Sequence, residues 1–254
     1  MEILTEADLR SRFAAESKKD VVVKKGTFVT PLAMEYIRTN GLKLVVEDSV
    51  SSGGTFGKGL MSYTPIKQTG NDRFVDYISG KTYSHKPEHM THLRDNLLVE
   101  KNHPRILFRG KLDSLEALII KTQLTAAENG RGDVAEQLED VMEFVKLLLG
   151  CEVKDEPIPE FKLLGMDSQR LRYVSHHIFE EFGIQHSVPH YSMGKVCAEL
   201  NYLRTFIRET ELSAVAAFTV DGEMTRSDIV EALNRLSSCV YIIFCKVASE
   251  NKKG

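Results

Sequence analysis

Two arginines and a carboxylate lie one helical turn apart within an apolar stretch of the C-terminal half. Arg204, Arg208 and Glu211 are separated by four and three residues, so a helix would place all three on one face. Such a face can be merely solvated, with ion pairs that contribute little to stability. However, guanidinium groups flanked by apolar residues commonly pair with carboxylate or phosphate. The spacing therefore indicates an anion-binding face.

Two further polar clusters have both a structural and a functional interpretation. Residues 232–238 read ALNRLSS, and the adjacent Asn234 and Arg235 need partners, either a neighbouring backbone or a bound ligand. Residues 110–117 read GKLDSLEA, where Asp113 and Glu116 have the spacing of a capping box. This spacing predicts that a helix begins at Asp113.

Taken in order, these clusters resemble signatures of the ATP:cob(I)alamin adenosyltransferase family. The family patterns are G-x-x-D-E-L-N/S, then R-x-x-x-R-R-x-E-R, then L-N-R-L-S-D, and their order and separation agree with this chain. The resemblance is closest to the ethanolamine-utilisation branch and covers roughly residues 86–246, while the preceding part resembles that branch alone. Matching segments are PEHMTHL at 87–93, HPR at 103–105, FRGKLDS at 108–114, LRTFIRETE at 203–211 and ALNRLSS at 232–238.

The resemblance implies an enzyme that transfers the 5′-deoxyadenosyl group of ATP to cob(I)alamin. The products would be adenosylcobalamin, for use by ethanolamine ammonia-lyase, and triphosphate, with Mg²⁺ accompanying the phosphates. Because negative charge accumulates on the leaving triphosphate, fixed cations must lie against it. By match to the family motifs, Arg208 would contact the phosphates, and Glu211 and Asn234 would fix the nucleotide. Arg204 would pair with Asp113 across a subunit boundary, which implies a homo-oligomer with an inter-subunit site.

The segment that closes over the phosphates departs from the family pattern. The resemblance assigns this role to Thr91, Arg94 and Lys101, but residues 91–96 read THLRDN where the family has the glycine-rich T-x-T-G-D-x-G-T. Without glycine, backbone amides cannot cradle phosphate in the same way. Three signature positions also differ, since Glu209 and Leu212 replace arginines and Ser238 replaces an aspartate.

Relatives displace the lower axial ligand of cobalamin by wedging an aromatic side chain beneath the corrin. His186 falls at the matching position, and Phe182 and Tyr191 are alternatives that the sequence leaves open. Some relatives also carry a CCxxC metal cluster, but this chain has no cysteine before Cys151. The histidines at 85, 89, 92 and 103 are the alternative ligands, and they lack a matching carboxylate spacing. We therefore predict no metal other than Mg²⁺ on ATP.

Two non-enzymatic functions compete with catalysis. One is a corrinoid carrier or microcompartment adaptor, which the altered glycine and arginine positions favour. The other is a helical nucleotide-binding regulator without a corrinoid role. Retention of the phosphate-binding residues favours the enzyme, because a carrier does not need them. A reductase and ethanolamine ammonia-lyase are the protein partners that the resemblance implies.

The elements that would position these residues are mainly helical. Apolar residues recur at spacings of three and four in five segments, which predicts a five-helix bundle. The segments are 113–128, 133–149, 167–182, 192–218 and 226–247. We predict a mainly α fold in which this bundle, residues 87–254, follows a small α+β appendage and flexible linker at 1–86.

The appendage is predicted from capping and turn signals. A helix is expected from Thr5, with Asp8 at capping-box spacing, and a second helix from Thr30-Pro31 to Asn40-Gly41. Strands are expected at 21–23 and 42–46. Residues 47–86 are rich in Ser, Gly, Thr and Lys, which predicts a flexible linker. The run at 53–59 resembles a phosphate loop only superficially, since no strong strand precedes it.

Composition excludes some classes of function. A net charge of −3 and a pI near 6.3 favour neither nucleic acid nor a membrane surface as a partner. No apolar run approaches the ~18 residues of a membrane span, and the first 25 residues do not form a signal-peptide pattern. The four cysteines are scattered singly, which predicts reduced, buried thiols. We expect a cytoplasmic protein, and the resemblance adds association with a bacterial microcompartment.

Overall fold

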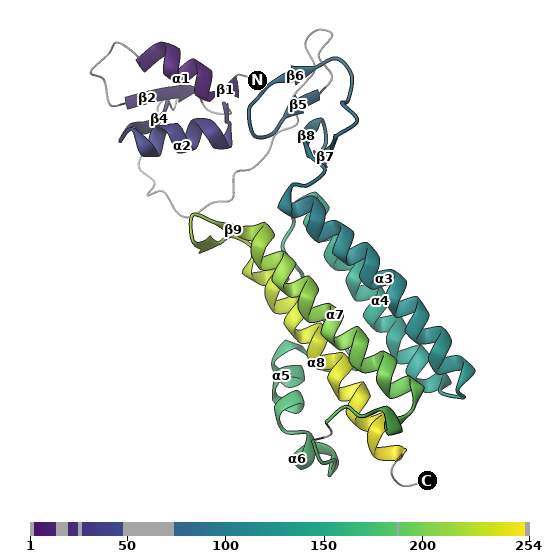
Figure 1. The fold of residues 1–254 in the computed structure, drawn as a ribbon. Helices are drawn as coiled ribbons and strands as arrows, with labels where there is room; N and C mark the ends of the chain where they lie inside the picture. The colour runs from purple at the N-terminus through teal and green to yellow at the C-terminus, as the bar shows by residue number, and fades with distance from the viewer. Residues whose placement is uncertain (1–2, 14–19, 25–26, 48–73, 187, 252–254) are drawn as a thin grey trace. The chain divides into compact units, whose positions relative to one another are not determined.

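A computed structural model describes residues 3–13, 20–24, 27–47, 74–186 and 188–251 (Figure 1). The chain divides into two compact units, residues 1–101 and residues 102–254. The domain boundary expected from the sequence, between residues 86 and 87, comes earlier in the chain than this division. The difference arises because strands formed by residues 90–100 belong to the first unit. Each unit is described by itself.

The first part of unit 1 is the predicted α+β appendage. Helices α1 (Glu6–Phe13) and α2 (Pro31–Thr39) accompany two parallel strand pairs. These pairs are β1 (Ile3–Leu4) with β3 (Phe28–Val29), and β2 (Asp20–Lys24) with β4 (Lys43–Glu47). Both predicted caps form, since the Asp8 amide donates to Thr5 Oγ1 at 3.2 Å and the Ala33 amide donates to Thr30 Oγ1 at 3.3 Å.

The second part of unit 1 is a four-stranded sheet, which the sequence did not predict. Its strands are β5 (Phe74–Asp76), β6 (Thr82–Tyr83), β7 (Met90–Arg94) and β8 (Leu97–Glu100), in the order β6-β5-β8-β7. The expected linker over 47–86 is therefore wrong for β5 and β6, whose few residues are too short to show a period of two. The remaining linker residues, 48–73, include the glycine-rich run and lie outside the described residues.

Unit 2 is a bundle of four long helices that run side by side (Figure 1). They are α3 (Pro104–Glu128), α4 (Gly132–Lys154), α7 (Lys195–Phe218) and α8 (Ser227–Glu250). Short helices α5 (Ser168–His176) and α6 (Ile178–Phe182) follow α4, and α5 packs on α8. A 3₁₀ turn, Tyr191–Met193, precedes α7, and the hairpin of β9 (Thr219–Val220) and β10 (Glu223–Met224) joins α7 to α8. The predicted mainly α fold is confirmed.

Two predicted helix boundaries are wrong. The first bundle helix begins at Pro104, with His103 as its N-cap, so Asp113 is an exposed residue in mid-helix and not a cap. Pro104 at the first helical position is the stronger start signal, because its missing N–H costs nothing there. The predicted helix at 167–182 is interrupted at His177, whose φ of −123° is not helical.

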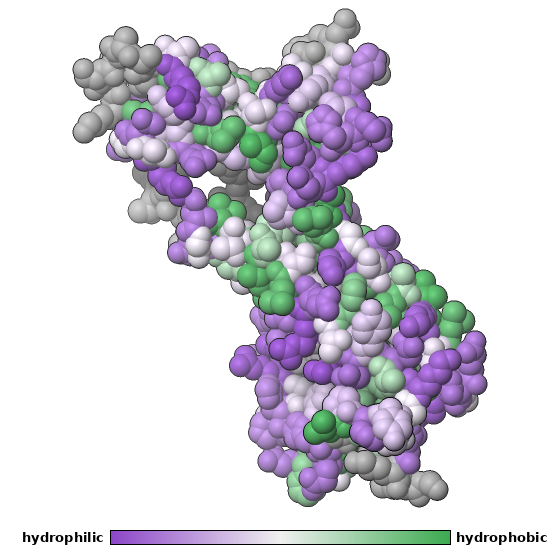
Figure 2. Space-filling model, in the orientation of Figure 1, coloured by the Kyte–Doolittle hydropathy of each residue, from purple (hydrophilic) through white to green (hydrophobic). Residues whose placement is uncertain are grey.

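The surface and the thiols of unit 2 also bear on function. All four cysteines are free and buried, as predicted. Leu107, Ile120 and Leu124 on α3 are more than half exposed, and apolar side chains are visible along α3 in Figure 2. Within the described ranges, no helix is both long and apolar enough to cross a membrane.

Candidate active site

A pocket of about 300 Å³ in unit 2 gathers predicted site residues from separate parts of the chain. Helix α7 contributes Arg204 and Arg208, α8 contributes Asn234, and the segment before α7 contributes His186. The complete lining is Ser175, His176, His186, Arg204, Arg208, Asn234, Ser237, Ser238 and Tyr241. The pocket wall is therefore rich in hydrogen-bond donors.

The two arginines of α7 stack on one face of the helix, as their spacing predicted. Arg204 is half-buried, donates from Nη2 to Asn201 Oδ1 at 3.1 Å, and lies 5.9 Å from the centre of the Tyr241 ring. Arg208 is exposed on the next turn. Among the described residues, neither guanidinium has a carboxylate within ion-pair distance. Their charge is thus available to an anionic ligand.

The side-chain amide of Asn234 is held between two charged groups. Arg235 is buried and donates from Nη1 to Asn234 Oδ1 at 2.6 Å. Asn234 Nδ2 in turn donates to Glu211 Oε1 at 3.4 Å. Because the carbonyl oxygen accepts from Arg235, the amide group must face Glu211. This contact brings Glu211 to the edge of the pocket beside Asn234.

His186 and Tyr241 form a contact that the sequence did not predict. His186 Nδ1 is hydrogen-bonded to the Tyr241 hydroxyl, and the two rings are nearly parallel, with centroids 5.9 Å apart. Burial raises the pKa of Tyr241, so the phenol is protonated at neutral pH. Tyr241 lies two helical turns after Asn234, and this spacing was the signal that could have placed it on the same face.

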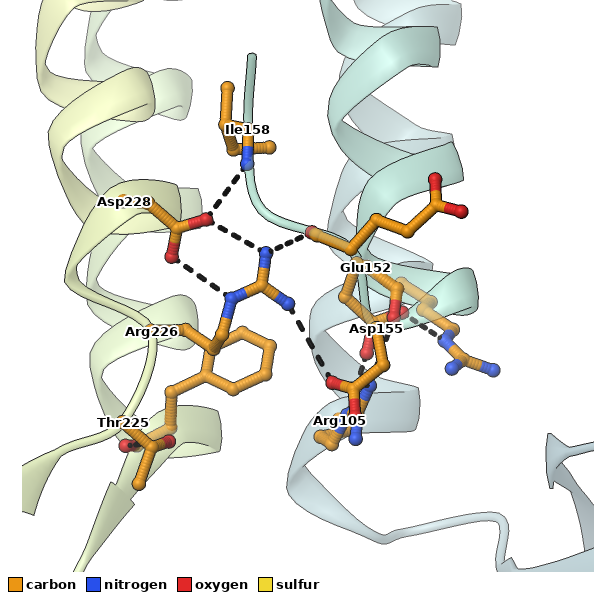
Figure 3. A network of polar contacts seen from close by, with 10 residues as sticks. Arg105, Glu152, Asp155, Ile158, Thr225, Arg226 and Asp228 are labelled. Atoms are coloured by element: carbon orange, nitrogen blue, oxygen red, sulfur yellow. Dashed lines mark hydrogen bonds and ion pairs between the residues drawn. The ribbon is translucent and has the colours of Figure 1, made fainter. Parts of the chain in front are cut away.

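A second polar cluster, around Glu152, lies elsewhere in the bundle, and its charged groups contact one another (Figure 3). The Glu152 carboxylate is fully buried and accepts from Arg105 Nε at 2.6 Å and from Arg109 Nε at 2.5 Å. Arg105 Nη2 also donates to the Glu152 carbonyl oxygen at 2.9 Å. The residues are 43 and 47 positions apart in sequence, so these bonds join α3 to α4.

Arg226 extends this buried cluster to α8. Its Nε and Nη2 each donate to the Asp228 carboxylate at 2.9 Å, and Nη2 also donates to the Glu156 carbonyl at 2.7 Å. Asp228 accepts a third bond from the Ile158 amide at 3.0 Å. Burial acts to raise the pKa of Asp228, but the hydrogen bonds from Arg226 and Ile158 outweigh it and the pKa is lowered. This cluster holds helices together.

Comparison with known proteins places the chain in a family. The model of the cobalamin adenosyltransferase family matches residues 82–247, which include every residue of the pocket. The chain belongs to the cobalamin adenosyltransferase family. The resemblance stated from the sequence is thus confirmed, and the chain is an adenosyltransferase.

Two relatives carry the name corrinoid adenosyltransferase EutT. The protein from Salmonella typhimurium strain LT2 is 37% identical over 162 residues, which span 62% of this chain and 58% of that protein. The protein from Escherichia coli K12 is 29% identical over 249 residues, 95% of this chain and 91% of that protein. The aligned region thus covers less than two thirds of the first relative and most of the second.

Several predicted residues of this adenosyltransferase lie in unit 2 but outside the pocket lining. Asp113 is exposed on α3 and makes no ion pair with Arg204 within the described part of the chain. Phe182, the last residue of α6, has the Lys246 ammonium 4.7 Å from its ring centre. Tyr191, the other alternative to His186, is 86% exposed.

The other predicted phosphate ligands belong to unit 1. Thr91 and Arg94 lie on β7, and Lys101 follows β8 and pairs with Glu88, with 3.3 Å between Nζ and Oε1. Strand β7 is an edge strand of its sheet. Their roles stay predictions of the family resemblance.

Three of the four histidines considered as metal ligands have other side-chain contacts. His85 Nδ1 lies 3.1 Å from Ser84 Oγ, His92 Nδ1 lies 2.9 Å from the Asp95 carbonyl, and His103 caps α3. Burial, together with Arg105 and Arg109, lowers the pKa of His103. In the portion of the chain that the structure describes, no group of three or more His, Cys, Asp or Glu side chains could hold a metal ion.

Proposed function

We propose that this protein transfers the 5′-deoxyadenosyl group of ATP to cob(I)alamin, giving adenosylcobalamin and triphosphate. Family membership supports adenosyl transfer to a corrinoid. The observation that carries the ATP half is Arg208, which lines the pocket and has no carboxylate partner among the described residues. An uncompensated guanidinium group in a pocket suits a phosphate.

The proposed reaction is a nucleophilic displacement at the 5′ carbon. The Co(I) electron pair forms the Co–C bond while the C5′–O bond breaks, and the leaving electron pair stays on the triphosphate oxygen. Arg208 neutralises the charge that develops there, which is worth about 3 kcal/mol for one well-placed donor. Mg²⁺ enters with ATP and is held by its phosphates. The Glu211–Asn234 contact orients the nucleoside.

We propose further that the site is completed between copies of this chain. Arg204 has no carboxylate partner in the described part of its own chain, and Asp113 is exposed on α3. The same helix exposes Leu107, Ile120 and Leu124, and exposed apolar side chains of this kind are commonly covered in an oligomer (Figure 2). An Arg204–Asp113 pair between subunits accounts for both observations. Thr91, Arg94 and Lys101 would close over the phosphates.

The cellular setting follows from the proposed reaction. A reductase must supply cob(I)alamin, and an adenosylcobalamin-dependent enzyme must consume the product. The resemblance to the ethanolamine-utilisation branch supports ethanolamine ammonia-lyase as that consumer and a cytoplasmic location at a microcompartment.

A corrinoid carrier or microcompartment adaptor is the second candidate. Glu209, which replaces a signature arginine, pairs with Lys111, with 3.4 Å between Oε2 and Nζ. Leu212, which replaces a second signature arginine, is 69% exposed. Two cations of the family pattern are thus missing from α7, which would weaken phosphate binding. A carrier would bind cobalamin without releasing triphosphate.

The test is an assay with chemically reduced cobalamin, Mg-ATP and chelator-treated protein. Loss of the cob(I)alamin absorption band and release of triphosphate are followed for the wild type and for Arg208→Ala. The control is Arg10→Ala, because Arg10 is exposed in unit 1, where its guanidinium pairs with Glu6 and lies over the Tyr36 ring. Turnover by the wild type and the control, but not by Arg208→Ala, supports the enzyme. Cobalamin binding with no triphosphate release would favour the carrier.

A further inference from the structure

The hydrogen bond between His186 and Tyr241 joins two walls of the pocket. His186 comes from the segment between α6 and α7, whereas Tyr241 comes from the middle of α8. Both side chains line the same cavity as Arg204 and Arg208. The Tyr241 ring also lies beneath the Arg204 guanidinium and stacks on Phe244, with centroids 6.3 Å apart. Tyr241 is therefore fixed in place on two sides.

The direction of this hydrogen bond determines which nitrogen of His186 carries a proton. The Tyr241 hydroxyl is protonated and has one proton to donate, and His186 Nδ1 is its hydrogen-bonded neighbour. A phenol is a stronger donor than a neutral imidazole N–H, and an unprotonated imidazole nitrogen is a stronger acceptor than a phenol oxygen. The phenol therefore donates to Nδ1. An imidazole whose Nδ1 accepts carries its proton on Nε2.

We propose that Tyr241 is a positioning residue that holds His186 as the Nε2–H tautomer, so that His186 donates a hydrogen bond to a phosphate oxygen of bound ATP. This inference rests on the proposed function for the identity of the ligand, and it assigns His186 to ATP in place of the corrin contact that the family resemblance implied. The rest of the wall supports it, because Arg204, Arg208 and Ser238 also carry donor groups, and they suit a phosphate group, which offers only acceptors. Amide carbonyls of a corrinoid side chain are the other source of acceptor oxygens, and the experiment separates the two.

The first measurement is made on the free protein and does not depend on activity. With ¹⁵N-labelled histidine, long-range ¹H–¹⁵N correlations report which ring nitrogen of His186 is protonated, and the His186→Phe variant assigns the signal. We expect the Nε2–H tautomer in the wild type and a mixture of tautomers in Tyr241→Phe, which removes only the hydroxyl. An Nδ1–H tautomer in the wild type overturns the proposal.

The second measurement is the affinity for Mg-ATP and, separately, for cobalamin by titration calorimetry. Losing a hydrogen bond to a charged oxygen weakens binding by about tenfold or more, so we expect this loss of ATP affinity in His186→Phe and a smaller one in Tyr241→Phe. His186→Gln keeps an N–H donor and should recover most of the affinity. The control is His177→Phe, because His177 does not line this pocket.

The outcomes distinguish this inference from the proposed function. If only cobalamin affinity falls in His186→Phe, the assignment to ATP is wrong. If His186→Gln does not restore the ATP affinity that is lost in His186→Phe, His186 does not act as a hydrogen-bond donor to ATP. Tautomer and ATP effects without adenosyl transfer would leave the inference standing and sink the proposed function. Adenosyl transfer by a wild type whose His186 carries its proton on Nδ1 would support the proposed function and overturn the inference.

Discussion

The bundle contains two arginine clusters that differ in how their charge is balanced. Around Glu152, the guanidinium groups of Arg105, Arg109 and Arg226 each contact a carboxylate or a backbone carbonyl (Figure 3). In the pocket, Arg204 and Arg208 have no carboxylate partner among the described residues. Both clusters look alike in sequence, as arginines on amphipathic helices. The difference separates charges that maintain the fold from charges kept for a ligand.

The closed cluster should also resist change more than the open one. A buried ion pair adds little stability over an apolar replacement, but removing one partner leaves a buried charge without compensation. An exposed guanidinium can be removed without that penalty, because water solvates whatever it leaves behind. Substitutions around Glu152 should therefore change stability, whereas substitutions of the pocket arginines should change activity.

Removal of Glu152 should have the largest effect. Glu152→Ala removes the buried carboxylate that Arg105 and Arg109 share and should lower the free energy of unfolding by about 3–5 kcal/mol. Urea denaturation of the two proteins at pH 7 measures the difference. Glu143→Ala on the same helix serves as a control, because Glu143 is exposed and pairs with the exposed Lys146. If both variants are equally stable, the cluster does not hold α3 to α4.

Arg208→Ala should show the opposite behaviour. We expect kcat/KM for adenosyl transfer to fall about 10²–10³-fold, because the leaving triphosphate loses a fixed cation. The free energy of unfolding should stay within about 0.5 kcal/mol of the wild type, as for other exposed positions. Steady-state kinetics and urea denaturation of one preparation test both statements. A large loss of stability would place Arg208 with the structural arginines instead.

Asp228 should make the stability of the closed cluster depend on pH. Its folded-state pKa is lowered, so its contribution is complete above the unfolded value of about 3.9 and is lost as pH falls further, through the folded pKa. Asp228→Asn should cost about 1.5 kcal/mol at pH 7, the lower end for a hydrogen bond to a charged group. Denaturation at pH 7 and pH 3 should show this difference shrinking at the lower pH. If the two proteins differ in free energy of unfolding by the same amount at both pH values, the charge of Asp228 is not the source of the difference.

The open pocket was easier to predict from sequence than the closed cluster. Arg204, Arg208 and Glu211 are local neighbours on one helix, so their spacing alone placed them together. Glu152 and its arginine partners come from helices whose contacts are long-range, and no local pattern pairs Arg105 with Glu152. Tyr241 was missed for a related reason, because its partner His186 is 55 residues away.

Helix boundaries were also predicted correctly where one local signal stood alone. Thr30 and Pro31 gave the correct start of α2, because no competing signal lies nearby. At the first bundle helix, the capping-box spacing of Asp113 competed with His103-Pro104, and the rigid proline start prevailed. The sheet from β5 to β8 could not be predicted because its stability comes from pairing between short strands and from burial of residues such as Leu98.

The smallest predicted effect concerns whether a second copy completes the open cluster. Asp113→Ala and Arg204→Ala should each lower activity about tenfold if these side chains pair between subunits. Mixing the two variants under conditions that exchange subunits creates interfaces with an intact pair, because each chain supplies what the other lacks. Activity should then rise above that of either variant alone, in proportion to the mixed interfaces formed. If mixing restores nothing although subunits exchange, Arg204 finds its counter-charge in the substrate alone, and the pocket is complete within one chain.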